Sequence, residues 1–234
     1  MAIKLKSALK TIPWSLAAKA VITAGSWLLL PFWVFVLVVF YFYFIPLFRP
    51  FKFIALFLSF LILAFLLPVN WAAALALAVV FFLILGIKDL IFIERRTVYE
   101  ISVLLISLLA FISFFSIYSF LDISSLKGVV LILILGYFLL RGLIDYLRTG
   151  TDNRAVDLAS FVISLIISEL LLVLLIMPFD FYSRLALTFL VFILLLDLNI
   201  HYFERKLTNR KILIDFTIFF ILAAVILASI NLGI

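Results

Sequence analysis

The sequence predicts an all-α integral membrane protein, a polytopic helical bundle of eight or nine transmembrane helices arranged as three or four antiparallel hairpins with basic cytoplasmic tips. Hydrophobic residues make up 69% of the 234 residues and charged residues 13%, and the mean hydropathy is +1.45. Soluble domains carry roughly 45–50% apolar and about 25% charged residues, and disordered chains are poor in apolar residues. The composition therefore excludes both of these classes.

Residues 1–26 are predicted to form a basic amphipathic N-terminal segment. Within residues 4–16, apolar side chains lie on one helical face and lysine, serine and threonine on the other, as in helices that lie on an anionic cytoplasmic membrane surface. Residues 13–30 carry only Lys19 as a charge and could form a weak first crossing. We expect no cleaved signal peptide, because residues 11–17 are too short an apolar stretch.

Eight apolar segments follow, most of them close to the roughly 20 residues that a helix needs to cross a membrane. They run over residues 28–48, 53–68, 71–92, 99–118, 128–147, 156–177, 184–203 and 212–232. Because the links between them are short, sequential helices are expected to be antiparallel neighbours. Residues 27–234 are therefore predicted to form a single transmembrane bundle. Its candidate hairpin repeats cover residues 28–68, 71–118, 128–177 and 184–232.

Basic residues gather in every second link and determine the predicted orientation. They are Arg49, Lys52, Lys88, Arg95, Arg96, Arg141, Arg148, Arg154, Arg205, Lys206, Arg210 and Lys211. By the positive-inside rule these links are cytoplasmic and the C-terminus lies outside, in a cell membrane (plasma or inner) whose anionic headgroups attract the basic side. A cytoplasmic N-terminus then requires nine crossings, which we favour. Eight crossings would leave the basic N-terminus outside.

Acidic residues follow the basic links at nearly equal intervals along the chain. Glu100, Asp157 and Asp215 each lie near the start of a predicted helix, where the helix dipole favours negative charge. Each of them can also pair with the arginine of its own link. The spacing suggests a duplicated hairpin, although unrelated membrane hairpins with basic tips show the same pattern.

Charged groups inside a membrane are costly and mark candidate functional sites. Glu169 lies about 18 Å along its helix from Asp157, and is predicted as a proton or cation site or as a neutral carboxyl bonded to another helix. Arg141 and Asp197 lie about 10–12 Å inside the link arginines, and are expected to form an ion pair between their helices. Near the cytoplasmic surface long side chains reach water easily. Weaker candidates there are Lys88, Asp89, Asp145, Asn199 and His201.

The sequence contains no recognisable catalytic constellation. Cysteine is absent and His201 is the only histidine, which excludes disulfides, thiolate metal sites and multi-histidine cages. Serine-nucleophile, zinc-protease and glycine-rich phosphate motifs are also missing. An enzyme acting on lipid would have to use Asp145, Asp197, His201 or Glu169. We therefore predict no catalytic residue, no metal and no cofactor.

Two functions are compatible with this pattern. The preferred one is a non-catalytic multi-pass membrane subunit or scaffold with protein or lipid partners. The alternative is a small transporter or channel for an ion, proton or amphiphile that uses Glu169 and the Arg141/Asp197 layer. Few glycine or proline residues interrupt the spans, whereas such interruptions mark many transport sites. The net charge of +6 is spread among the spans, so no nucleic-acid partner is expected.

Aromatic residues are abundant, with 28 phenylalanines. They are expected in lipid contacts and helix packing rather than around a ligand cavity. Trp14, Trp27, Trp33 and Trp71 lie near the predicted span ends, where tryptophan anchors helices at the membrane surface.

The orientation predicts which positions an impermeant thiol reagent reaches in intact cells. The native chain has no cysteine, so each introduced cysteine reports alone. Cysteines at Ser124 and Ser183 should be labelled from outside. Those at Arg96, Thr151 and Thr208 should be labelled only after the cells are permeabilised. Labelling of this second group in intact cells would reverse the orientation.

Overall fold

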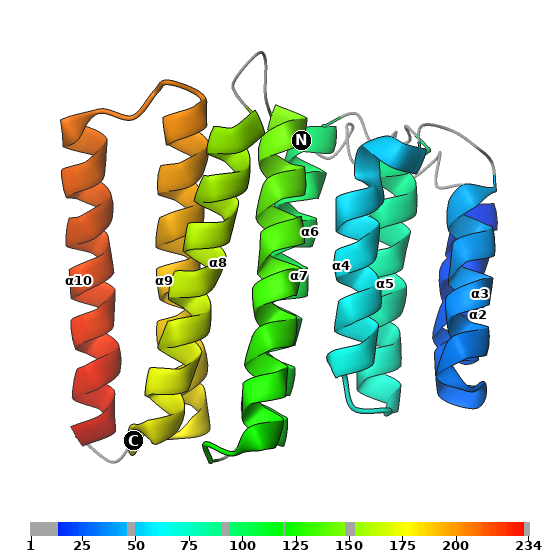
Figure 1. Ribbon diagram of the computed structural model, residues 1–234, viewed down its shortest axis with the longest axis horizontal. Coiled ribbons are helices and arrows are strands. Elements are labelled where there is room, and N and C mark those ends of the chain that lie inside the picture. Colours follow the sequence, from blue (N-terminus) through cyan, green and yellow to red (C-terminus); the bar gives the residue numbers. More distant parts are fainter. Residues whose placement is uncertain (1–13, 46–49, 90–93, 119, 148–152, 232–234) are drawn as a thin grey trace, which may run out of the picture. The chain divides into compact units, whose positions relative to one another are not determined.

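The computed structural model describes residues 14–45, 50–89, 94–118, 120–147 and 153–231. Across these ranges the regular structure is helical and contains no strand (Figure 1). The elements are α2 (Trp14–Leu29), α3 (Phe32–Phe44), the 3₁₀ helix η1 (Pro50–Phe53), α4 (Ile54–Leu66), α5 (Trp71–Lys88), α6 (Arg95–Ile117), α7 (Ile123–Leu147), α8 (Asn153–Ile176), α9 (Phe181–Phe203) and α10 (Asn209–Asn231). Most of the predicted surface helix over residues 4–16 lies outside these ranges.

Six of the described helices, α5 to α10, are long and apolar enough to cross a membrane. The apolar helices α3 and α4 have 13 residues each and extend about 20 Å, less than the roughly 30 Å of a hydrocarbon core. The chain is therefore a multi-pass helical membrane protein, and the number of eight or nine crossings stays a prediction. A residue is called exposed where other residues of the chain do not cover it, whether it faces lipid or water.

The chain divides into two compact units, residues 1–102 and 103–234. Helix α6 begins in the first unit and ends in the second. The predicted single bundle over residues 27–234 stays a prediction.

Aromatic side chains fill the core of the first unit. Helix α2 packs against α3 and α5, and α4 packs against α5. Tyr43 of α3 stacks on Phe57 of α4 with ring centroids 4.0 Å apart. Phe60 of α4 contacts Phe35 and Phe81 at centroid distances of 6.4 and 5.2 Å. All of these side chains are fully buried, so phenylalanine here serves in helix packing.

Trp27 also lies inside the first unit, so its predicted role as a surface anchor is wrong. Its side chain is 5% exposed, and its Nε1–H donates to the carbonyl oxygen of Ala64 at 3.1 Å. That carbonyl belongs to the last turn of α4, where helical carbonyls lack partners. Trp14, Trp33 and Trp71 are exposed, as membrane-surface anchors require.

The helical conformation is interrupted between α2 and α3, inside the segment predicted as one span over residues 28–48. Helix α2 ends at Leu29 and α3 begins at Phe32. Pro31 has no N–H to continue α2, and its φ of −56° suits the position before a helix. Its carbonyl accepts from the N–H of Phe35 at 3.1 Å. The helix in this segment is therefore shorter than predicted.

Helices that follow an acidic link begin earlier than the hydropathy pattern predicts. Asp122 precedes α7 and accepts from the N–H of Ser125 at 2.6 Å, while its own N–H donates to Ser125 Oγ at 2.9 Å. Asp180 precedes α9 and accepts from the N–H groups of Tyr182 and Ser183 at 2.9 and 3.2 Å. These caps satisfy N–H groups of the first turn, so polar residues outside the apolar runs still belong to the helices.

The cap on α9 depends on an ionised carboxylate. The Ser183 hydroxyl donates to Asp180, and this hydrogen bond holds the pKa of the Asp180 carboxyl below its ordinary value. The cap therefore contributes stability above the ordinary pKa of the carboxyl. That contribution is lost as the pH falls through the lowered value.

In the second unit α7, α8, α9 and α10 lie side by side in chain order (Figure 1). Helices α7 and α8 make the most extensive contact, α9 packs against both, and α10 packs on α9. Within the apolar part of α10, 0% of the residues are buried. Helix α10 therefore lies at the edge of this unit.

Small side chains allow α7 and α8 to approach closely. Ser160, Ser164 and Ser168 of α8 are buried on successive turns. The hydroxyls of Ser164 and Ser168 donate to the carbonyls four residues earlier at 2.7 and 2.8 Å. A Cβ atom on Gly136 of α7 would lie 3.0 Å from Ser164 Oγ. Contacts between small residues are a common means of association for membrane helices.

A Schellman turn ends α9 and reverses the chain toward α10. Arg205 has a φ of 57°, and its N–H donates to the Tyr202 carbonyl at 3.0 Å. The N–H of Lys206 donates to the His201 carbonyl at 2.9 Å, which completes the motif. Glycine usually occupies this left-handed position, and arginine here keeps the link basic.

Gly136→Leu should lower the free energy of unfolding by about 1–3 kcal/mol, as overpacking typically does, because a Cβ atom there would lie 3.0 Å from Ser164 Oγ and the two helices would have to shift apart. Unfolding in detergent micelles measures the change. The control is Ala224→Leu, which adds a leucine to an exposed position of α10 and should be nearly neutral. Equal stability of the two variants would contradict close packing of α7 on α8.

Candidate functional site

A network of charged side chains joins α9 to α10 in the second unit. Lys211 Nζ lies 2.7 Å from Asp197 Oδ2 and 2.8 Å from Asp215 Oδ1. Lys211 and Asp215 lie one turn apart on α10, whereas Asp197 belongs to α9. One ammonium group therefore binds two carboxylates by charge-assisted hydrogen bonds and fixes α10 against α9.

His201 extends this network along α9. Its Nδ1 lies 2.8 Å from the carbonyl oxygen of Asp197 and 3.3 Å from Asp197 Oδ1. Both neighbours are acceptors, so the geometry favours a proton on Nδ1. His201 thus supports Asp197 within the same helix.

Arg141 joins α7 to α8. Its Nε lies 2.9 Å from Asp157 Oδ1. Its Cζ lies 5.9 Å from the centroid of the Tyr137 ring, which is a cation–π distance. The contact between these two helices therefore combines a small-residue packing surface with an ion pair toward the basic link.

The predicted ion pair between Arg141 and Asp197 is wrong. Arg141 pairs with Asp157, and Asp197 pairs with Lys211. The prediction matched Arg141 to Asp197 by depth alone, whereas a side chain must also lie on the face that turns toward its partner. Each charge instead finds its partner on the helix that follows its own in the chain.

The predicted pairing of each acidic residue after a basic link with an arginine of that link is confirmed for Glu100 and Asp157, whereas the partner of Asp215 is a lysine. Glu100 Oε1 lies 2.9 Å from Arg96 Nε. Asp157 pairs with the arginine of α7, and Asp215 pairs with Lys211. The repeated hairpin that motivated this prediction stays a prediction.

In the first unit Lys88 of α5 is fully buried. Its Nζ donates to the Tyr43 carbonyl oxygen at 2.5 Å and lies 3.3 Å from Asp89 Oδ1. The ammonium also lies 5.4 Å from the centroid of the Tyr43 ring. Tyr43 belongs to the last turn of α3, whose carbonyls lack helical partners and carry partial negative charge. Lys88 therefore joins α5 to the end of α3.

Lys19 of α2 supplies a second cation to the same end of α3. Its Nζ donates to the Ile45 carbonyl at 3.3 Å. The expectation that Lys88 reaches water at the membrane surface is therefore wrong, because helix carbonyls and Asp89 take the place of water. The charge of Lys19, the main objection to a crossing by α2, is likewise stabilised by a carbonyl oxygen.

The remaining weaker candidates have different surroundings. Asp145 is exposed on α7, and Asn199 is buried on α9. The Nδ2 atom of Asn199 has no hydrogen-bond partner in the described part of the chain. Asp89 is partly buried next to Lys88. No group of three or more His, Asp or Glu side chains suited to a metal occurs among the described residues.

Glu169 is exposed on α8. It makes no hydrogen bond or ion pair with any residue that the structure describes. It lies five residues after Ser164, about 140° around the helix, so it points away from the packed serine side of α8. Glu169 therefore does not line the cavity described below, and it makes no polar contact with a described residue of a neighbouring helix.

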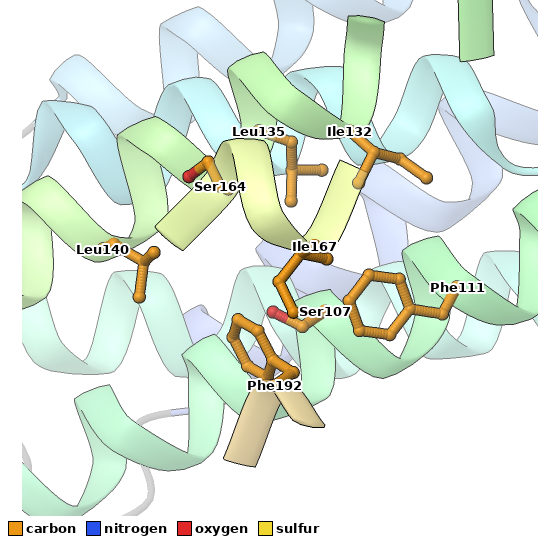
Figure 2. Close-up of a pocket in the computed structure, with 9 residues that line it drawn as sticks. Ser107, Phe111, Ile132, Leu135, Leu140, Ser164, Ile167 and Phe192 are labelled. Atoms are coloured by element: carbon orange, nitrogen blue, oxygen red, sulfur yellow. The ribbon is translucent and has the colours of Figure 1, made fainter. Parts of the chain in front are cut away.

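A small cavity lies among α6, α7, α8 and α9 in the second unit, and Figure 2 shows its serines on two different helices. It is lined by Ser107, Phe111, Ile132, Leu135, Gly136, Leu140, Ser164, Ile167 and Phe192. Its free interior is about 10 Å³, room for about one water molecule and far too little for a small-molecule ligand. The lining offers two hydroxyl groups and no charge to a bound ion.

The charged contacts of both units join helices rather than surround this cavity. No family model, no curated protein and no solved structure matches the chain. Its function is therefore inferred from its own residues. Arg141 and Lys211 in the second unit and Lys88 in the first each bind groups on a different helix.

The buried serines of α8 are the main feature that the sequence prediction missed. Ser160, Ser164 and Ser168 carry no charge, and so they did not stand out among intramembrane candidates. Serine at every fourth position of an otherwise apolar helix is the signal that identifies such a packing surface.

Double-mutant cycles should separate the observed ion pair from the predicted one. Asp197→Leu and Lys211→Leu should show a coupling energy of about 1 kcal/mol, a modest value because these side chains are 38% and 32% exposed. The matched control cycle combines Asp197→Leu with Arg141→Leu and should be additive. SDS unfolding in mixed micelles measures both. Coupling only in the control cycle would contradict the observed network.

Proposed function

We propose that the protein is a non-catalytic membrane subunit or scaffold that works with protein or lipid partners. The observation that supports this role is that its charged side chains bind neighbouring helices of the same chain. Lys88, Arg141 and Lys211 each bind a group on another helix of the chain, and the cavity in the second unit has no charged lining residue. Such contacts stabilise a fixed arrangement of helices and provide no path for a charged substrate.

We propose a topology of nine crossings, with α2, α3 and α4 added to the six long helices. The N-terminus and the basic links then lie in the cytoplasm and the C-terminus outside the cell membrane, as the positive-inside rule favours. The bond from Lys19 to the end of α3 supports the crossing by α2. The short helices α3 and α4 would lie in a locally thinned bilayer, and anionic headgroups would bind the basic links.

Transport of an ion, proton or amphiphile has less support. It would use Glu169 with the Arg141/Asp197 layer, yet Arg141 and Asp197 bind separate partners. Glu169 lies on the exposed face of α8, away from the serine side that lines the cavity. Transport sites at mid-membrane depth are built between helices.

Reconstitution into liposomes tests the proposal directly. Proton, sodium and potassium flux should equal that of protein-free liposomes, and Glu169→Gln should change nothing. Size measurement after gentle solubilisation of native membranes should give a complex larger than one chain. Protein-dependent flux that Glu169→Gln abolishes would instead establish the transport alternative. A single chain without partners would exclude the scaffold.

A further inference from the structure

The outer face of α8 carries a carboxyl group in the middle of an apolar stripe. The stripe consists of Leu158, Val162, Leu165, Glu169, Leu172 and Ile176, which recur at alternating intervals of four and three residues. Leu172 is partly exposed and the others are exposed. This interval is the heptad repeat by which two helices pack along a common seam.

The stripe lies on the side of α8 that its own unit leaves uncovered. The buried side of the helix centres on Ser164, Ser168 and Leu171. Leu165 and Glu169 lie about 100° and 140° around the helix from Ser164. The packing within the second unit therefore leaves five of the six seam residues exposed and Leu172 partly exposed.

An intramembrane carboxyl on such a face needs a partner. Glu169 lies about 24 Å along α8 from Asn153 and about 10 Å from Ile176, well inside the apolar span. Ionisable side chains within membrane helices almost always face the bundle interior or a water-filled cavity, and polar side chains bond across helices. Lipid chains offer Glu169 no hydrogen bond, whereas a second helix can.

We propose that a second copy of this chain covers the face, so that two α8 helices pack in parallel with their Glu169 carboxyls bonded to each other. A two-fold axis along the membrane normal brings each seam residue to the same depth as its counterpart. A neutral carboxyl both donates and accepts a hydrogen bond, so two of them satisfy each other without a net charge. A single polar residue in a heptad seam also fixes the register of the two helices.

The charges of the chain indicate which group of a second copy meets Glu169. The basic side chains nearest the membrane interior, Lys88, Arg141 and Lys211, already bind groups of their own chain. The group in a second copy that a parallel arrangement brings to Glu169 is therefore another Glu169. This inference rests on the proposed role as a membrane subunit, for which it names the partner.

Disulfide cross-linking in native membranes tests the seam. Leu165→Cys should form a dimer on oxidation, because the residue faces its counterpart across the two-fold axis. The control is Ile221→Cys on α10, which is 58% exposed and lies as far from the start of its helix as Leu165 does. It should cross-link at the low level of random collision. Equal cross-linking of both variants would overturn the proposal.

Two substitutions of Glu169 test the carboxyl pair in the Leu165→Cys chain. Glu169→Leu should reduce the cross-linked fraction about fivefold or more, as expected for a polar contact between membrane helices. Glu169→Gln should retain the dimer, because an amide also donates and accepts. Loss of the dimer with glutamine as well would indicate a basic partner on another protein and would overturn the carboxyl pair.

The native size of the complex separates this inference from the proposed function. A complex larger than one chain without a seam cross-link would overturn the dimer and leave the subunit role intact. A single chain without a cross-link would overturn both. A cross-linked dimer that tolerates glutamine but not leucine at Glu169 would support both.

Discussion

Charged side chains near the ends of the helices hold neighbouring helices of this protein together. Lys88 binds the carbonyl end of α3, Arg141 binds Asp157, and Lys211 binds Asp197. A membrane interior provides no water for an unpaired charge or carbonyl, so each of these groups requires a partner on an adjacent helix. Only Lys88 is fully buried, so loss of its partners would leave a buried charge behind, whereas the pairs of Arg141 and Lys211 are partly exposed. These two pairs therefore add to the packing contacts that already join α7 to α8 and α9 to α10.

Between these charged ends the two units pack by different means. In the first unit large aromatic rings fill the space between helices, with Tyr43 stacked on Phe57. In the second unit Gly136 and Ser164 bring α7 and α8 into close contact. Because lipid is as apolar as the helices, no hydrophobic force drives them together, and both the aromatic packing and the small-residue packing rely on van der Waals contact. Aromatic packing tolerates wider helix spacing, whereas small-residue packing requires that the positions stay small.

The surfaces that remain exposed bear most directly on function. Helix α10 contributes no buried residue to its apolar part, which suits a helix that faces lipid. The exposed face of α8 is different because it carries Glu169 at mid-span. The one intramembrane carboxyl without a partner among the described residues thus lies on an outer surface. That position is more consistent with assembly than with transport through the unit.

Composition and charge by themselves determined that this is a helical multi-pass membrane protein, because no other fold accommodates so many apolar residues. The pairing of Glu100, Asp157 and Asp215 with basic residues also followed from sequence, because these partners are close along the chain or across one link. The starts of α3, α7 and α9, just after Pro31, Asp122 and Asp180, were predicted only partly from the sequence, because hydropathy does not detect capping hydrogen bonds.

Only the tertiary structure decided which faces meet. Arg141 and Asp197 have similar depth but bind different helices, and Lys88 is buried against Tyr43 rather than extended to water. Glu169 turns outward. Depth follows from the position of a residue in its span, whereas the facing of a side chain depends on the rotation of each helix against its neighbours. That rotation is set by contacts between residues far apart in sequence.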